Sequence, residues 1–400
     1  MRAKFYLLSS FFFSTLAVTL VCFAEAPSVA KSDARQGGII FHCNSEQSER
    51  MIHDLTRYLA TLKIQQKWVR SFQNKKLERL QFALTTQIDD TSTLDFHQRP
   101  EFQIHDEVIS LPQLKGKPEK VITVSKKEIL LSLLQHGRTT TFPKNACHLQ
   151  ALKEHIELRQ NIVAWTEDVD WFWPENIPAF WNSKYWKEGT PVRGKPLTKI
   201  LMDPFLEPEK YAFGCYTAAK LIFAHGILDY YARVIKNSKL AKLIQRKLMK
   251  DGEPLVHVEP GKMWYFEPDS SPKEISRPGK ILTMVDHVAP KNFVPGDWVY
   301  FYNNDPVSHA MTGYEGSNPI YLGRNKFSDY YNLNNHGYTL HEKLYMVYQW
   351  RHGVLDPHED AAKAQPISQD QLDALTAPPE KGGFLLSYRA FPQYLGYSRK

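Results

Sequence analysis

The sequence lacks several features that would assign it to a class at once. Beyond residues 1–26, no segment is long and apolar enough to span a bilayer, and no internal repeat or long low-complexity segment occurs. It contains no EF-hand loop and no Cys/His cluster at metal-binding spacing, so no metal or other cofactor is expected. The net charge of +7 is modest for 400 residues and is spread along the chain, so nucleic acid is not an expected partner.

Residues 1–26 have the layout of a secretory signal peptide. Arg2 and Lys4 precede an apolar run that ends in small residues. Cleavage after Ala24 or Ala26 is expected, with an uncleaved N-terminal anchor as the alternative. We therefore expect the mature protein to be exported and to be periplasmic, envelope-associated or secreted.

Cysteine is rare, and its number matters in an oxidising compartment. Removal of the signal leaves three cysteines, so one of them stays outside any disulfide within the chain. If Cys43 and Cys147 form a disulfide, the remaining thiol is Cys215. That residue lies in YAFGCYTAAKLIFAHGILDYY (211–231), where small and apolar residues recur at helical spacing. Cys215 is either an inert core residue or a thiol whose pKa is lowered by a helix N-terminus.

The remaining pattern predicts an N-terminal region, a catalytic domain and a C-terminal arm, at 27–140, 141–353 and 354–400. In the N-terminal region we expect a strand at 37–41 and then a long amphipathic helix, capped by Asn44 and Gln47, that reaches about residue 84. The arm is polar, contains prolines and is expected to be loosely attached, with an aromatic end that docks elsewhere.

The 141–353 segment predicts helices followed by strands. A second helix is expected from 142 onward, and an antiparallel sheet across roughly 297–348. Five of the nine tryptophans fall in 165–186, which is typical of a segment that seals a core or walls a groove. The basic stretch 233–250 indicates a solvated helix face, or else a strip that docks an acidic partner or an anionic envelope surface.

A cysteine at a helix start followed by an antiparallel sheet that carries His and an acid or amide is the arrangement of papain-like cysteine enzymes. The thiolate needs the helix dipole and an imidazole, and the imidazole needs a third group that holds its ring. In the sheet region the candidate bases are His309, His336 and His341, and the nearest candidate acid is Glu315. Each of these is alternatively an ordinary strand, loop or turn residue.

Over residues 142–350 the sequence resembles the bacterial protein-glutamine gamma-glutamyltransferases known from the spore coat. The segments that resemble the family are ELRQNIVA (157–164), NSKYW (182–186), YAFGCYTA (211–218), GDWVYFYN (296–303) and IYLGRNKF (320–327). The resemblance implies that Cys215 is the nucleophile, with Glu315 and His336 completing the site. Assigning these roles to Glu315 and His336 requires short insertions in this chain relative to the family. An ungapped match would place Ser317 at the position of the family's glutamate.

The resemblance also implies a fold and an activity. The implied fold is α+β and papain-like, with the cysteine helix packed on an antiparallel sheet and an added N-terminal helical region. The implied activity is transglutaminase acyl transfer from a protein glutamine to a lysine amine through a cysteine thioester, without calcium. Such an enzyme crosslinks proteins that bear Gln and Lys. Segment 165–186 is then the candidate screen that keeps water from the thioester.

Two other functions remain open at this point. A papain-like amidase or peptidase acting on peptidoglycan would use the same cysteine, with His309 as its base instead of His336. A noncatalytic binding or structural envelope protein of the same fold is the other alternative, because the residue before the cysteine is acidic in the family and is Gly214 here.

Overall fold

The computed structural model describes residues 37–85, 92–112, 119–167, 169–174, 178–250, 256, 258, 281–311, 313–331, 337–357, 360–377 and 379–390. Contacts divide the chain into Met1–Arg35 and Gln36–Lys400, and all described residues belong to the second unit. The predicted signal peptide therefore lies outside the described residues. None of the described helices combines the length and the apolarity that a bilayer span requires.

The N-terminal region forms a four-stranded sheet with the order β2-β3-β1-β6. Strands β1 and β6 pair in parallel, and the other neighbours are antiparallel. The bounds are β1 Gly38–His42, β2 Val69–Asn74, β3 Arg79–Leu84 and β6 Thr139–Phe142. The strand predicted at 37–41 is confirmed as β1.

Helix α1 (Ser45–Thr61) begins where the sequence predicts and ends earlier. The Gln47 N–H donates to the Asn44 side chain at 2.8 Å, and the Gln47 side chain accepts the Asn44 N–H at 3.0 Å, which confirms the predicted capping box. The predicted extension to residue 84 is wrong, because residues 69–84 form the β2–β3 hairpin. In β3 the alternate residues Leu80, Phe82 and Leu84 are buried, a period-2 pattern that fits a strand.

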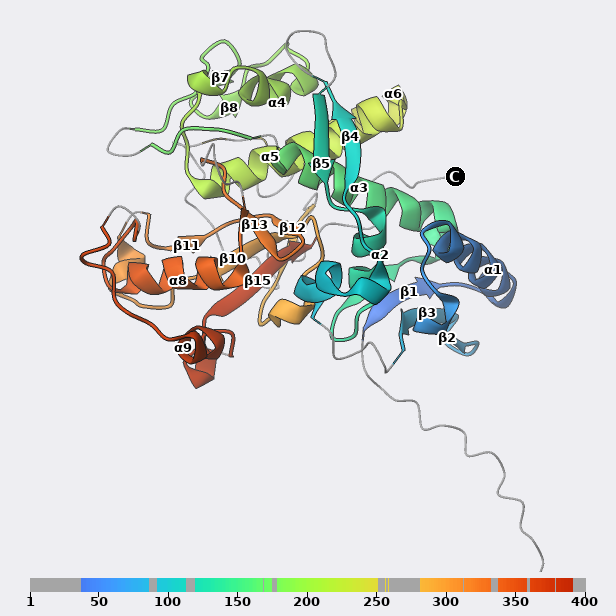
Figure 1. Cartoon of the computed structure of the whole chain (residues 1–400). Helices are drawn as coiled ribbons and strands as arrows, with labels where there is room; N and C mark the ends of the chain where they lie inside the picture. Colours follow the sequence, from blue (N-terminus) through green and yellow to red (C-terminus); the bar gives the residue numbers. More distant parts are fainter. Residues whose placement is uncertain are drawn as a thin grey trace, which may run out of the picture. The chain divides into compact units, whose positions relative to one another are not determined.

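Five α-helices follow along the chain, and two of them, α3 and α5, pack against each other. The five helices are α2 Lys126–Leu134, α3 Leu149–Glu167, α4 Leu197–Leu206, α5 Cys215–Asp229 and α6 Ser238–Lys250. Figure 1 shows α3 and α5 side by side. The helices approach closely at Gly226, where a Cβ would lie 3.0 Å from the Ile162 side chain, and the Asn161 amide donates to the Gly226 carbonyl at 2.9 Å.

A second four-stranded sheet, entirely antiparallel, has the order β11-β10-β15-β9. Its strands are β9 Thr283–Val285, β10 Trp298–Tyr302, β11 Gly316–Ser317 and β15 Leu385–Ala390. Strand β15 comes from the segment expected to be a loosely attached arm, and it lies between β10 and β9. That expectation is wrong for residues 385–390, because Leu386 and Tyr388 are buried in the sheet. The aromatic end of the chain, 391–400, lies outside the described residues.

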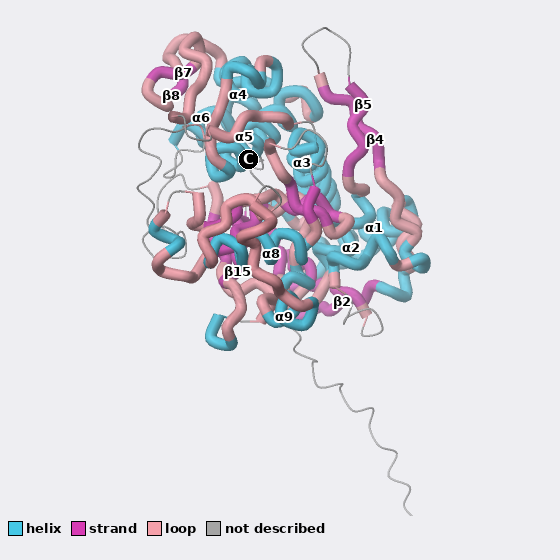
Figure 2. Tube along the Cα trace, turned by 60° about the vertical axis from the view of Figure 1, so that its left-hand side comes forward, coloured by secondary structure: helices cyan, strands magenta, loops and turns pink. Residues whose placement is uncertain are grey.

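The predicted sheet across 297–348 is interrupted by a helix. Residues Leu340–Arg351 form α8, which begins with a second capping box between Thr339 and Glu342. Before it lies a three-stranded sheet formed by β12 Tyr321–Gly323, β13 Lys326–Ser328 and β14 Gly337–Tyr338. Two hairpins pair β4 Glu107–Leu111 with β5 Glu119–Thr123 and β7 Trp186–Lys187 with β8 Thr190–Pro191. Helix α9 is Gln369–Ala374. Figure 2 shows the β4–β5 hairpin alongside α3.

The N-terminal region and the following helices share one core. The largest cluster of buried apolar side chains includes Ile39 of β1, Leu55 of α1, Ile222 of α5 and Trp298 of β10. A disulfide between Cys43 and Cys147, with Cα atoms 5.7 Å apart, joins the end of β1 to the start of α3. The pairing that the sequence left open is therefore present, and Cys215 retains its thiol.

Candidate active site

Cys215 is the first residue of α5, as the sequence predicts. Gly214 precedes the helix in an extended conformation, with φ −71° and ψ 165°, and its carbonyl accepts the Ala218 N–H at 3.1 Å. The Cys215 side chain is half-buried. A helix N-terminus presents N–H groups and a partial positive charge, so a thiolate at this position is electrostatically favoured.

A side-chain amide from the residue that follows β11 contacts the sulfur. Asn318 Nδ2 donates to Cys215 Sγ at 3.8 Å, a hydrogen-bond distance for the large sulfur atom. The Asn318 Oδ1 accepts the Trp298 indole N–H at 3.2 Å, and both residues are buried. Asn318 is not among the site residues predicted from the sequence, although it directly follows Ser317, the residue that an ungapped family match sets in place of the glutamate.

Glu315 lies in the loop before β11, and its carboxylate closes a turn. Its Oε2 accepts the Gly313 N–H at 2.8 Å, while its backbone carbonyl accepts the Tyr300 hydroxyl at 3.1 Å. Ser317, two residues later, is buried on β11 beside Asn318. The Glu315 carboxylate thus accepts a hydrogen bond from its own loop, and its catalytic role stays a prediction.

The three candidate histidines differ in their positions. His309 is half-buried, with Nδ1 at 3.1 Å from the Glu315 carbonyl oxygen, so that Nδ1 carries the hydrogen, and Nε2 at 3.5 Å from the Tyr302 hydroxyl. His341 is on α8, with Nε2 2.8 Å from a carboxylate oxygen of Asp373, and both side chains are largely exposed. His336 lies outside the described residues.

Several buried groups are within electrostatic reach of the Cys215 thiol. Burial raises the pKa of Tyr300, and the negative charge of Cys215 adds to this effect. Burial lowers the pKa of Lys343 on α8, whereas the negative charges of Asp329 and Cys215 act in the opposite direction. A phenol and an amine therefore lie within electrostatic reach of the thiol, and each interacts with a negative charge on the sulfur.

Comparison with known families identifies the chain. The family model described as protein-glutamine gamma-glutamyltransferase matches residues 102–349. The chain belongs to this family. It is a transglutaminase, an acyltransferase that crosslinks proteins, and the resemblance inferred from the sequence is confirmed. The match begins within the region predicted at 27–140.

Two further comparisons accompany the family match. The structure is similar to that of a transglutaminase from Geobacillus stearothermophilus without its C-terminal extension, with 17% sequence identity and a TM-score of 0.37. The similarity covers 62% of this chain and 97% of that chain. No curated protein matches the sequence. The elements of the transglutaminase themselves confirm the α+β class.

The tryptophan-rich segment of the transglutaminase packs beside the chain that leads into Cys215. Phe180 and Ala212 exchange backbone hydrogen bonds, and the Phe213 N–H donates to the Phe172 carbonyl at 3.3 Å. The rings of Trp173 and Tyr331 meet edge to face at 5.3 Å, and the Tyr331 hydroxyl donates to the Phe213 carbonyl at 2.8 Å. Large aromatic side chains thus lie against the residues just before the thiol.

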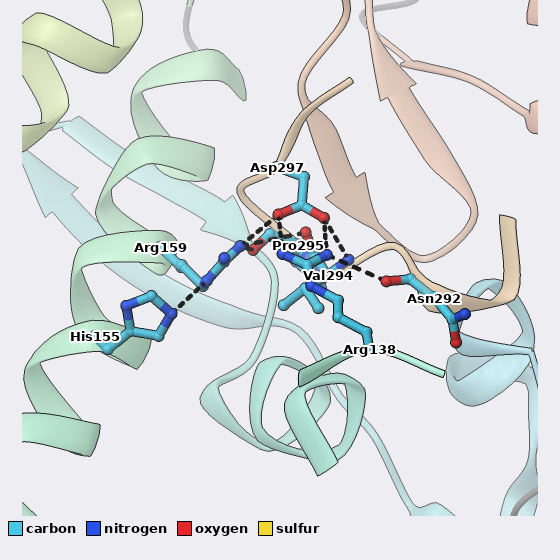
Figure 3. Close-up of polar contacts among 7 residues, drawn as sticks. All are labelled: Arg138, His155, Arg159, Asn292, Val294, Pro295 and Asp297. Carbon is cyan, nitrogen blue, oxygen red and sulfur yellow. Dashed lines mark hydrogen bonds and ion pairs between the residues drawn. The ribbon is translucent and has the colours of Figure 1, made fainter. Parts of the chain in front are cut away.

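A buried ion cluster holds the start of β10 in the transglutaminase (Figure 3). The Asp297 carboxylate is fully buried and pairs with both Arg138 and Arg159, the latter at 2.9 Å, and it accepts the Val294 N–H at 2.8 Å. Arg159 Nε donates to His155 Nε2 at 2.9 Å. Burial raises the pKa of Asp297, but the two guanidinium groups outweigh burial and the net shift is downward. Because Asp297 immediately precedes Trp298, this cluster positions the indole that binds Asn318.

The described part of the transglutaminase shows no group of three or more His, Cys, Asp or Glu side chains placed to bind a metal ion.

Proposed function

We propose that Cys215 is the nucleophile of this transglutaminase. Its sulfur attacks the γ-carboxamide carbon of a protein glutamine; a carbon–sulfur bond forms, the carbon–nitrogen bond breaks, and ammonia leaves after accepting a proton. A lysine ε-amine then attacks the thioester, so that an isopeptide bond forms and the thiol is restored. The observation that carries the proposal is a half-buried thiol at the first residue of α5, with an amide donor on its sulfur.

His336 is the proposed base, with Glu315 as the acid that orients it. The base takes the thiol proton in the first step and returns a proton to the leaving ammonia, and it serves the incoming amine in the same way. His336 precedes Gly337, which pairs with Ser328 in the three-stranded sheet. His309 is the alternative base, since it lies on the loop that also carries Glu315.

We propose that the helix and the sheet are arranged as in papain-like enzymes. The cysteine helix packs on an antiparallel sheet through aromatic contacts, with Tyr216 of α5 at 5.0 Å and Phe223 at 5.8 Å from Trp298 of β10. A rigid contact of this kind fixes the helix start relative to groups on the sheet. The aromatic segment around Trp173 and Tyr331 is the proposed screen that limits the access of water to the thioester.

The substrates that this mechanism requires are proteins that carry accessible glutamine and lysine side chains. Export of the enzyme is supported by the signal-like residues 1–26 and by the Cys43–Cys147 disulfide, because such bonds persist in oxidising compartments. Helix α6 exposes a row of lysine and arginine side chains along one face, which supports association with an anionic envelope surface: Lys239, Lys242, Arg246 and Lys250.

The test incubates the purified mature protein with casein and a fluorescent primary amine. We expect labelling by the wild type and none above background by Cys215→Ala. Release of ammonia from glutamine by wild type without labelling would mean that water, not the amine, resolves the thioester. Labelling that persists in Cys215→Ala would overturn the assignment of the nucleophile.

A further inference from the structure

We propose that Asn318 is a catalytic residue of this enzyme, whose side-chain amide stabilises the negative charge on the Cys215 sulfur, and that Trp298 positions it. This inference rests on the proposed role of Cys215 as nucleophile. The juxtaposition is made by the tertiary fold, because Asn318 and Cys215 are 103 residues apart in the sequence. The amide belongs to the residue that follows β11, whereas the thiol belongs to α5.

The hydrogen bonds determine which end of the amide faces the sulfur. A side-chain amide has one acceptor end and one donor end, and an indole N–H can only donate. Trp298 is fully buried and its N–H meets the Asn318 oxygen at 3.2 Å, so the NH₂ group is the end directed at Sγ. The opposite orientation would set the NH₂ group against the indole N–H, which would leave a buried donor without an acceptor.

The backbone around Asn318 is held on both sides. The Tyr330 hydroxyl donates to the Asn318 carbonyl at 2.8 Å, and the Val299 N–H donates to the carbonyl of the next residue, Pro319, also at 2.8 Å. Asn318 itself is only 7% exposed. The amide is therefore preorganised before substrate binds, and it costs no reorganisation when charge develops near it.

The indole is fixed as firmly as the amide. The Arg389 guanidinium lies 4.2 Å from the centre of the Trp298 ring, and the rings of Tyr216 and Phe223 pack against the same indole. The preceding residue is anchored by the buried ion cluster described above. A chain of contacts thus runs from Asp297 through Trp298 and Asn318 to the thiol.

The reason for an amide at this position is electrostatic. A neutral donor stabilises an anion without introducing a further buried charge, and one preorganised donor is worth about 10²–10³-fold in rate at sites where negative charge develops. The amide donor contacts the sulfur in the resting enzyme. Once the thioester forms, the sulfur carries no negative charge for the amide to stabilise. It therefore favours the reactive thiolate and its return when the amine resolves the thioester.

The experiment compares Asn318→Asp, Asn318→Ala and Trp298→Phe with the wild type. Asn318→Asp keeps the shape of the side chain, removes its N–H donors and adds negative charge. Asn74→Asp is the matched control, because Asn74 is the exposed last residue of β2 and its side chain accepts the Leu77 N–H at 3.1 Å. Two rates are measured: amine incorporation into casein, and alkylation of Cys215 by iodoacetamide as a function of pH. Thermal unfolding reports folding.

We expect both Asn318 variants to lose about 10²–10³-fold in kcat for amine incorporation. Their alkylation profiles are expected to move to higher pH by roughly one unit or more, furthest for Asn318→Asp. Trp298→Phe frees the amide to rotate, so we expect a loss of about 10-fold in kcat with little change in KM, and a smaller shift of the profile in the same direction. Asn74→Asp should match the wild type in every measurement.

Wild-type kcat and an unchanged alkylation profile in a folded Asn318→Asp enzyme would overturn the proposal. A loss of activity with an unchanged alkylation profile would also overturn it, because the amide would then act on something other than the sulfur. The Cys215→Ala control separates this failure from that of the proposed function: labelling that persists in Cys215→Ala refutes the nucleophile, whereas an inactive Cys215→Ala with wild-type-like Asn318 variants refutes only the role of the amide.

Discussion

Replacing Asp297 with Asn tests whether the buried ion cluster stabilises the sheet that carries the site. Asp297 has no exposed surface, and its carboxylate accepts hydrogen bonds from Arg138, from Arg159 and from the Val294 N–H. Asn keeps the shape of the side chain but removes the negative charge. Two guanidinium groups, each at least nine-tenths buried, then lose the carboxylate that balances them.

The expected cost follows from the burial of all three charged groups. Removing one partner of a buried ion pair costs roughly 3–5 kcal/mol, because an uncompensated charge remains in a medium of low polarity. Folded domains are typically stable by only about 5–15 kcal/mol, so this change takes a large part of the total. We expect the free energy of unfolding of Asp297→Asn, measured by urea titration with tryptophan fluorescence, to fall by that amount.

The matched control breaks an ion pair at the surface. Lys144 and Glu78 pair at 2.8 Å with side chains that are 62% and 48% exposed, so Lys144→Ala should cost about 1 kcal/mol or less. The reasoning would be refuted if Asp297→Asn and Lys144→Ala lowered the free energy of unfolding by the same amount.

The effect of Asp297 also depends on pH in a defined direction. The net pKa shift of its carboxyl is downward, so the folded state binds its proton less tightly than the unfolded chain does. The stabilisation is therefore complete above the unfolded pKa of about 3.9 and is lost as the pH falls through the lower folded value. The difference between wild type and Asp297→Asn should shrink in acid at constant salt concentration.

Three further predictions concern other positions. Burial raises the pKa of Glu128 to about 7, so its carboxyl binds a proton more tightly in the folded state than in the unfolded state. The free energy of unfolding should therefore fall by on the order of 2 kcal/mol between about pH 5 and 7. Glu128→Gln should abolish this pH dependence, as measured by urea titrations. At Gly316, with φ +150°, a Cβ would overlap a carbonyl oxygen of β10, so Gly316→Ala should displace β11 and lower kcat. Gly353 also has a positive φ, +73°, but no atom lies within 4 Å of a new Cβ there, so Gly353→Ala adds local backbone strain without overlap and should leave kcat unchanged. His336→Ala should reduce amine incorporation by about 10²-fold or more and His309→Ala by far less; the reverse order in the casein assay would make His309 the base.

Local sequence determined where two helices begin. The Asn44 and Gln47 capping box and the glycine before Cys215 act within a few residues, and α1 and α5 begin where they predict. Signals of the same local kind were present at Thr339–Glu342, where the prediction of strand was wrong. In residues 69–84 an apolar repeat fitted a helix, but the alternate burial of β3 suits a strand against β1. Pairing with neighbouring strands, and not the apolar pattern alone, determined that this segment is a strand and not a helix.

Other features were decided only by tertiary structure, because their partners are far apart in the sequence. Strand β15 has few local signals, yet it lies between β10 and β9, where pairing on both sides satisfies its backbone. Asp297 and Arg138 are separated by 159 residues, and Asn318 and Cys215 by 103. The sequence by itself determined the family and the position of the thiol at a helix start. Only the fold brought an amide, oriented by a buried indole, to that thiol.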